Sequence, residues 1–202
     1  MNTPSLCFAL ALLLTPVLYA QDAREPQPRH HVGSSAFVSF TFLLEESPEF
    51  FQLNYGYRLT ERDVLSVEAI TWKYGAPLGI PYGPSKDDPR EEYPGYVRAF
   101  GVGMAYQRFL WRNAYVALHA LPLLQHYIDE ANKRLQSGFQ LFLTGRVGYH
   151  VGLFNNRFFL EPSIAFTSWP INTNLPASFA EQEAKWPSYF LFEPGLHFGV
   201  RF

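Results

Sequence analysis

Alternation of apolar and polar positions with a period of two dominates this chain and is clearest near its C-terminus. Between Tyr189 and Phe202 every second residue is apolar, and the intervening positions include Glu193 and Arg201. Because successive side chains of a strand point to opposite faces of a sheet, the segment predicts a strand with one apolar and one polar face. The pattern assigns to the apolar face Phe190, Phe192, Pro194, Leu196, Phe198, Val200 and Phe202, and to the other face Tyr189, Leu191, Glu193, Gly195, His197, Gly199 and Arg201.

Seven further segments carry strand-like patterns, which makes eight predicted strands. These segments are residues 36–45, 51–60, 64–74, 96–108, 114–127, 138–153 and 158–170. Their connections alternate between short polar turns, at 60–63, 110–113 and 154–157, and longer loops, around 45–49, 75–95, 128–137 and 171–187. Short turns at one end and long loops at the other are typical of barrels that cross the outer membrane. The predicted fold is therefore all-β, an eight-stranded antiparallel up-and-down transmembrane β-barrel over residues 35–202.

The first twenty residues have the character of an export signal. They contain no charged residue, and their apolar run from Leu6 to Leu14 is shorter than the roughly 20 residues that a membrane-spanning helix needs. We expect cleavage after Ala20 and a flexible N-terminal segment over residues 21–34. The single cysteine, Cys7, lies inside the signal. Disulfides, thiolate metal sites and cysteine nucleophiles are therefore not expected in the mature chain.

Composition excludes other classes of protein. The 202 residues carry a formal net charge of −2, which offers no basic surface for nucleic acid. Aromatic residues make up 17% of the chain and charged residues another 17%, and the low charge and high aromatic content argue against disorder.

Alternation alone does not separate a membrane barrel from a soluble one, in which the apolar faces would point inward. The distribution of aromatic and charged residues favours the membrane. Aromatic residues gather near strand ends, as interface girdles do, and Trp169 and Trp186 are expected to anchor the last long loop there. Lysine is scarce on the predicted strands and occurs mainly in loops. The girdle residues are expected to be Phe109, Trp111, Tyr115, Phe154, Phe158, Phe159 and Trp169. A soluble secreted barrel remains the alternative.

The last seven residues, Leu196-His197-Phe198-Gly199-Val200-Arg201-Phe202, resemble the terminal strand of Gram-negative outer-membrane barrels. In that family the terminal aromatic residue and the alternating apolar residues imply recognition by the barrel-assembly machinery, here through Phe198, Val200 and Phe202. The predicted barrel as a whole resembles the small eight-stranded class that includes OmpA-type, OmpW-type and PagL-type barrels. The resemblance implies contact with outer-membrane lipid and lipopolysaccharide.

Charged residues on the polar strand faces form the main candidate site. An eight-stranded barrel is just wide enough for side chains to fill it, and buried charges must be paired. We therefore expect a polar, side-chain-filled lumen with a charge network of Arg58, Glu68, Arg146, Glu161, Glu193 and Arg201. The same face offers the residue types of a hydrolytic triad, namely Ser163, His197 and either Glu161 or Glu193. PagL-like barrels deacylate lipid A with such a triad from the lipid side, whereas these residues are expected to face the lumen.

Other candidate chemistry is weaker. His30 and His31 with His119 or His126 supply metal-ligand types without an acidic or cysteine partner at ligand spacing, so no metal and no cofactor are expected. The predicted function is that of a non-enzymatic, monomeric outer-membrane barrel of structural or interaction type, with long extracellular loops at 75–95 and 171–187 as contact surfaces. The alternatives are a PagL-like lipid A hydrolase and an OmpW-like conduit for small apolar ligands. An aqueous pore is not expected, because open channels use about 16 to 18 strands.

Overall fold

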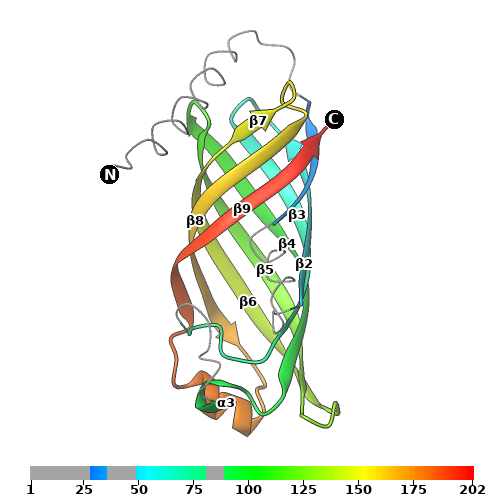
Figure 1. Ribbon diagram of the computed structural model, residues 1–202, viewed down its shortest axis with the longest axis vertical. Helices are drawn as coiled ribbons and strands as arrows, with labels where there is room; N and C mark the ends of the chain where they lie inside the picture. Colours follow the sequence, from blue (N-terminus) through cyan, green and yellow to red (C-terminus); the bar gives the residue numbers. More distant parts are fainter. Residues whose placement is uncertain (1–27, 36–48, 81–88) are drawn as a thin grey trace, which may run out of the picture.

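The computed structural model describes residues 28–35, 49–80 and 89–202 (Figure 1). The expected export signal at 1–20 and the expected strand at 36–45 lie outside these residues, as does part of the 75–95 loop.

Eight antiparallel wall strands close into a tall barrel with strongly tilted strands (Figure 1). Each strand pairs with its sequence neighbour, and the first pairs with the last, so that the sheet has no free edge. β6 and β7 pair one after the other with β8 and are separated only by His150, so they act as one wall strand. The strands are β1 (His30–Ser35), β2 (Phe50–Arg58), β3 (Asp63–Tyr74), β4 (Tyr96–Trp111), β5 (Ala114–Ile128), β6 (Arg134–Tyr149), β7 (Val151–Leu153), β8 (Phe158–Asn172) and β9 (Tyr189–Arg201). The predicted closed, eight-stranded antiparallel barrel is confirmed.

The first wall strand begins earlier than the sequence pattern indicates. β1 spans His30–Ser35 and pairs with both β2 and β9, so residues 30–34 are part of the wall and not of a flexible lead-in. Its sequence, HHVGSS, has little of the β-branched and aromatic character that marks a strand. Pairing on both sides, and not intrinsic propensity, holds this segment extended.

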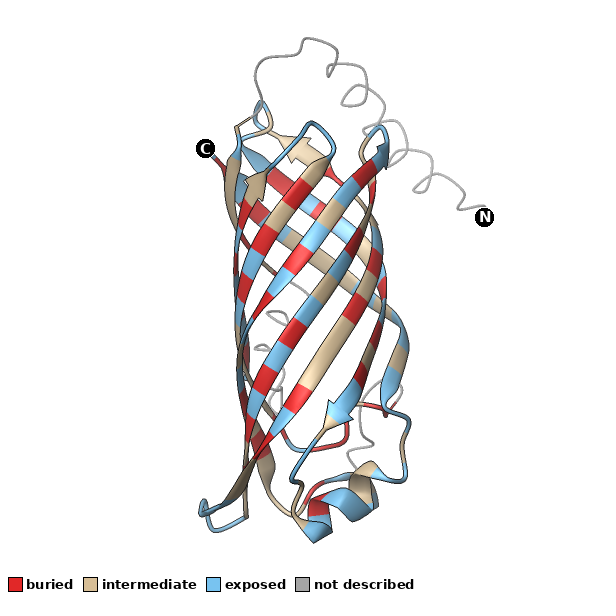
Figure 2. Ribbon diagram, turned by 180° about the vertical axis from the view of Figure 1, so that it is seen from behind, coloured by how far each residue is buried: buried red, intermediate tan, exposed pale blue. Residues whose placement is uncertain are grey.

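The barrel is apolar on its outer wall and polar inside, as the strand faces of β2, β4, β6 and β8 predicted. Buried and exposed residues alternate along the strands (Figure 2). On β4 the outward positions Phe100, Val102, Met104 and Tyr106 are exposed. Polar side chains occupy inward positions of β2, β3, β6 and β8 and are buried there, among them Gln52, Asn54, Ser66, Glu68, Gln140, Thr144, Arg146, Glu161 and Thr167.

A β-bulge in β9 breaks the expected alternation. Thr167 is paired with Phe190 and Ala165 with Glu193, so Leu191 and Phe192 together oppose a single residue of β8. Phe192 adopts a positive φ of 60°, an uncommon conformation for a bulky residue. The extra residue reverses the order of faces, so Phe190 lines the lumen while Leu191 and Phe192 are exposed. The assignments of Phe190 to the outer face and of Leu191 to the inner face were therefore wrong.

The two ends of the barrel differ. The turns after β2, β4 and β7 are short, and the turn at 154–157 places Asn155 and Asn156 at positive φ, which asparagine tolerates. At the other end lie the longer loops and the helix α3 (Ala177–Glu183), below the barrel in Figure 1. The connection between β5 and β6 is shorter than expected, because β6 already begins at Arg134. No helix in the described part is long and apolar enough to cross a membrane.

An aromatic core closes the long-loop end. Phe179 of α3 is fully buried, stacks on Tyr93 of the 75–95 loop at 4.8 Å between ring centroids, and meets Tyr127 edge-on at 5.3 Å. The described parts of the two long loops therefore pack against each other and against the barrel rim, which joins them into a cap.

Only part of the expected aromatic girdle lies on the outer wall. Trp111, Phe154 and Phe158 are exposed, as expected for girdle residues. Phe109, Tyr115, Phe159 and Trp169 are buried, and Trp169 stacks on Phe142 instead of anchoring the loop at an interface. These four occupy inward strand positions, so nearness to a strand end did not by itself predict the face on which an aromatic side chain lies.

Candidate functional site: the barrel lumen

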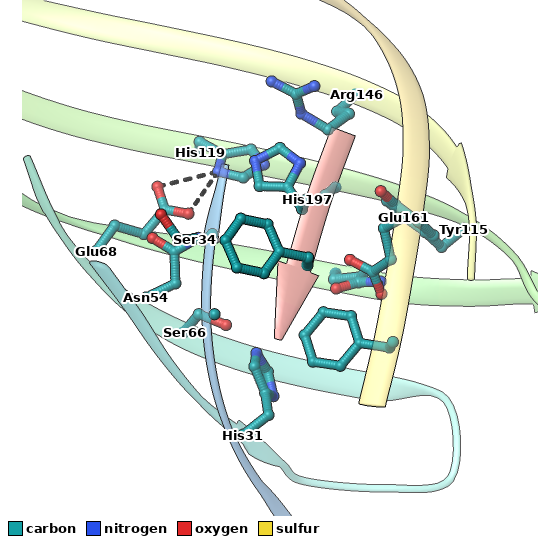
Figure 3. Close-up of a pocket in the computed structure, with 16 residues that line it drawn as sticks. His31, Ser34, Asn54, Ser66, Glu68, Tyr115, His119, Arg146, Glu161 and His197 are labelled. Atoms are coloured by element: carbon teal, nitrogen blue, oxygen red, sulfur yellow. Dashed lines mark hydrogen bonds and ion pairs between the residues drawn. The ribbon is translucent and has the colours of Figure 1, made fainter. Parts of the chain in front are cut away.

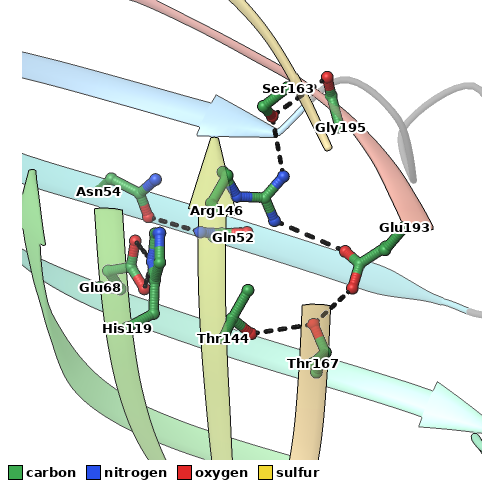
Figure 4. A network of polar contacts seen from close by, with 10 residues as sticks. All are labelled: Gln52, Asn54, Glu68, His119, Thr144, Arg146, Ser163, Thr167, Glu193 and Gly195. Carbon is green, nitrogen blue, oxygen red and sulfur yellow. Dashed lines mark hydrogen bonds and ion pairs between the residues drawn. The ribbon is translucent and has the colours of Figure 1, made fainter. Parts of the chain in front are cut away.

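Arg146 is the centre of a polar cluster in the lumen (Figure 4). Its Nη1 donates a hydrogen bond to Ser163 Oγ at 2.9 Å, and its Nη2 lies 3.5 Å from the Glu193 carboxylate. Thr167 Oγ1 donates to Glu193 at 2.7 Å and is 3.1 Å from the hydroxyl of Thr144. Arg146 and Glu193, two members of the predicted charge network, therefore lie beside each other among hydroxyl groups.

A glycine makes room for this arginine. A Cβ at Gly195 would collide with Arg146 Nη1, and Gly195 also accepts a 3.3 Å hydrogen bond from Ser163 through its carbonyl oxygen. The glycine opposite Ser163 on β9 therefore lets the guanidinium lie flat against the wall.

Glu68 forms a second cluster with a histidine that the sequence did not single out as its partner. Both carboxylate oxygens lie within hydrogen-bond distance of His119 Nδ1, at 3.0 and 3.1 Å (Figure 3). Glu68 is only 4% exposed. A carboxylate enclosed to this degree requires a partner, and β5 supplies it from the next strand but one.

Glu161 belongs to a third cluster, nearer the short turns. It accepts hydrogen bonds from Gln107 Nε2 at 3.2 Å and lies 2.7 Å from His150 Nδ1. His150 in turn lies 3.5 Å from Arg201 Nη2. Gly56 leaves the space in which the ring of His31 lies, and this ring meets Phe159 edge-on at 5.5 Å.

The six predicted network residues thus form separate clusters rather than one network. Glu68, Arg146, Glu161 and Arg201 are buried in the lumen, whereas Arg58 is partly exposed and donates to the carbonyl oxygen of Glu61 at 2.9 Å. Histidines pair with the two most enclosed glutamates. Sequence alternation placed His150 on the polar face, but nothing in the sequence indicated which carboxylate it would meet.

The predicted triad residues do not assemble. Ser163 is bonded to Arg146 and Gly195, and His197 has no hydrogen-bonded partner among the described residues. A serine–histidine hydrogen bond occurs elsewhere, between His126 Nδ1 and Ser137 Oγ at 2.8 Å, on outward positions of β5 and β6. No carboxylate among the described residues bonds this histidine, so the pair lacks the third group that orients a catalytic base.

The adjacent histidines at the start of β1 point in opposite directions. His30 lies on the outer side, 2.7 Å from Tyr55 Oη, and His31 lies in the lumen. A strand separates neighbouring side chains in this way, so the two rings cannot share a metal ion. Within residues 28–35, 49–80 and 89–202, no three metal-ligating side chains come together.

The lumen is only partly filled by side chains. Its short-turn half retains about 40 Å³ of free space beside His31, Glu161 and His197, which is room for about one water molecule (Figure 3). The long-loop half contains a cavity of about 730 Å³. The expectation of a side-chain-filled lumen therefore holds for the short-turn half and is wrong for the long-loop half.

A carboxylate of the cap over the long-loop end bonds both the 75–95 loop and the barrel. Glu183 of α3 accepts hydrogen bonds from Tyr93 Oη at 2.5 Å and from Trp169 Nε1 at 3.0 Å. Burial and the neighbouring Glu183 charge raise the pKa of Tyr93 well above its ordinary value, which keeps this hydroxyl a donor. At the rim, hydrogen bonds from Arg98 and Lys73 lower the pKa of Glu49.

Comparison with known proteins returned no match among protein-family models, curated proteins or solved structures.

Proposed function

We propose that this chain is an integral outer-membrane β-barrel of structural or interaction type, exported by its first twenty residues. The observation that carries the proposal is the apolar outer wall. Mid-strand residues on this wall are among the most exposed apolar side chains of the described chain, with Val102 at 62%, Val147 at 64% and Leu118 at 67%.

A soluble barrel does not account for this arrangement. In water, apolar outer positions on every side of the barrel would form a patch far larger than the few hundred Å² that soluble monomers expose, while charged groups would be enclosed at a cost. In lipid the same wall is solvated by acyl chains, and closure of the sheet satisfies the backbone polar groups. The inversion of faces therefore supports the membrane over the soluble alternative.

The terminal strand supports assembly by the barrel-assembly machinery. Phe198 and Val200 lie exposed on the outer side of β9 near the short-turn end, and Phe202, which follows the strand, is exposed too. Removal of Phe202 is expected to lower the amount of assembled barrel in cells, whereas removal of the outward turn residue Trp111 as W111A is expected to leave it unchanged. Equal amounts of assembled barrel in both variants would count against the assembly signal.

The lumen supports a role without solute flow. The clusters around Glu161 and Arg146 occupy the section between the 730 Å³ cavity and the short-turn end, where about 40 Å³ remains free. We therefore propose a monomer that conducts no solutes and whose capped long-loop end contacts partners or lipopolysaccharide at the outer surface.

Fractionation of Gram-negative cells that express the full chain tests the membrane proposal. We expect the protein in the outer-membrane fraction after a carbonate wash, solubilised only by detergent, with an electrophoretic mobility that changes on heating. Recovery in the periplasmic extract without detergent would overturn the proposal.

A further inference from the structure

We propose that the cavity in the long-loop half of the lumen binds a small organic cation with an apolar body. The cavity measures about 730 Å³, within the range of pockets that enclose small ligands, about 300–1,000 Å³. The inference concerns the lumen alone and goes beyond the proposed membrane role, which depends on the outer wall.

Aromatic rings from opposite sides of the barrel line this space and meet across the lumen. Phe50 meets Trp72 at 5.6 Å between ring centroids, Trp72 meets Phe142 at 6.2 Å, and Phe142 stacks on Trp169 at 5.7 Å. These four residues come from four strands, and all of them line the cavity. The faces of aromatic rings attract cations, tryptophan most strongly, and also pack against apolar groups.

The bulge in β9 adds a further ring to this lining. Without the extra residue at Leu191 and Phe192, alternation would place Phe190 on the outer face. The bulge instead turns Phe190 into the cavity, three positions before Glu193, at the expense of a positive φ at Phe192. Bulges that re-aim a side chain and strained backbone positions concentrate at functional sites.

The floor of the cavity carries an excess of carboxylates. Glu68 and Glu193 line it together with one guanidinium, that of Arg146, and with the histidines His119, which is bonded to Glu68, and His197. The side chain of Glu193 is 34% exposed and that of Arg146 only 8%, so the carboxylate and not the guanidinium faces the free space. Their closest separation is 3.5 Å, which leaves Glu193 able to accept another donor.

The rim of the cavity also carries more carboxylates than ammonium groups among its lining residues. Glu49 and Glu92 line the mouth with one lysine, Lys73, whose ammonium group is held by Glu49 and by the ring of Tyr96 at 4.6 Å. Lys73 and Tyr96 occupy outward positions of β3 and β4, so this contact lies on the outer side of the rim and not inside the cavity.

Glu68 is already bonded to His119, and Glu193 keeps an exposed carboxylate beside Arg146. An anion would be repelled by this carboxylate and an uncharged ligand would gain no charge contact with it, so a cation fits best.

Titration calorimetry with three probes that share a naphthalene body and carry a cationic, a neutral or an anionic substituent tests the inference. The full mature chain is placed in phosphatidylcholine nanodiscs, and empty discs serve as the blank. The probes are 1-naphthylmethylammonium, 1-naphthylmethanol and 1-naphthoate. We expect the cation to bind about tenfold more tightly than the alcohol, in keeping with cation–π and charge contacts in an enclosed site, and the anion to bind weakest.

Matched variants assign the site. E193Q should abolish the preference for the cation, whereas E161Q, which changes a buried luminal carboxylate outside the cavity, should preserve it. F190A should weaken cation binding, whereas F192A, which removes the ring beside it on the outer wall, should leave binding unchanged. Heat-modifiable mobility confirms that each variant is folded.

Several results would overturn the inference: no binding of any probe, equal or tighter binding of the alcohol or the anion, or an equal effect of F190A and F192A. A chain that does not enter the discs contradicts the membrane proposal instead, and the same titrations are then made on the chain in buffer. The two proposals therefore fail in distinguishable ways.

Discussion

Glu68 and Glu161 show how individual residues make a charged lumen tolerable. Each carboxylate is enclosed by the wall, and each lies beside a histidine, His119 at 3.0 Å and His150 at 2.7 Å. Histidine is suited to this position because its ring packs against apolar neighbours while one nitrogen meets the carboxylate.

Removal of one member of such a pair should therefore be costly. H119A leaves the Glu68 carboxylate enclosed without its partner, and we expect a loss of about 3–5 kcal/mol in the free energy of unfolding. Urea unfolding in lipid measures this loss. The control is H30A, because His30 lies on the outer side. A loss in H119A no larger than that in H30A would contradict the assigned pairing.

Glu49 provides a test of charge at the rim. Its pKa is lowered chiefly by hydrogen bonds from Arg98 and Lys73. A carboxylate whose pKa is lower in the folded than in the unfolded state stabilises the fold above its unfolded pKa, and this contribution disappears as the pH falls through the folded pKa. We expect R98Q to raise the titration midpoint of Glu49 in carbon-detected NMR, and R112Q, in a turn at the other end, to leave it unchanged. Equal midpoints in wild type and R98Q would contradict this contact.

At the level of elements, alternation predicted most strands but not the places where pairing is irregular. β2, β4, β6 and β8 have the expected faces because apolar residues alternate with polar or small residues over most of their length. β1 was missed because its small and polar residues resemble a loop, and only contacts distant in the sequence define it. The bulge at Leu191 and Phe192 was missed because both residues are apolar, so a shift in register leaves no mark on the pattern.

The luminal clusters were also predictable only in part, because alternation gives the face of a residue but not its partner. Alternation put Arg146, Glu161 and Glu193 on the inner face, but their partners depend on tilt and register across the barrel. Glu161 pairs across the sheet with His197, yet its close contact is His150 on the continuation of β6. The cavity was missed because the alternation pattern shows which side chains face the lumen but not how much of the lumen they fill.

α3 should depend on the carboxylate that joins it to the barrel. In E183Q, Tyr93 and Trp169 lose a charged acceptor, and such bonds are about twice as strong as neutral ones. We expect amide hydrogen exchange in Ala177–Glu183 to become about tenfold faster. E181Q changes an exposed residue of the same helix and serves as the control. Equal exchange rates in the two variants would show that Glu183 does not hold the cap.

At the level of the whole molecule, the main feature is that the faces of the sheet are inverted relative to a soluble barrel. Apolar side chains cover the outside of a closed sheet, while carboxylates, guanidinium groups and histidines meet inside it. The closed sheet leaves no unpaired edge, the short turns and long loops give the barrel two different ends, and the cap covers a cavity with an aromatic wall. In water, the apolar outer wall would be exposed to solvent while charged groups were enclosed in the lumen. In a bilayer, acyl chains would solvate the outer wall and the polar groups would pair inside the barrel.

Methyl NMR of the unmodified sequence in lipid discs with acyl-chain spin labels tests this inversion most directly, since neither face is altered by substitution. If the outer wall faces acyl chains, the signals of its exposed methyl groups broaden strongly, namely those of Val102, Leu118, Val147 and Ile164. The buried luminal methyl groups of Val64, Leu121 and Leu123 then keep sharp signals. Equal broadening of both sets, or broadening of the luminal set alone, would contradict this inversion.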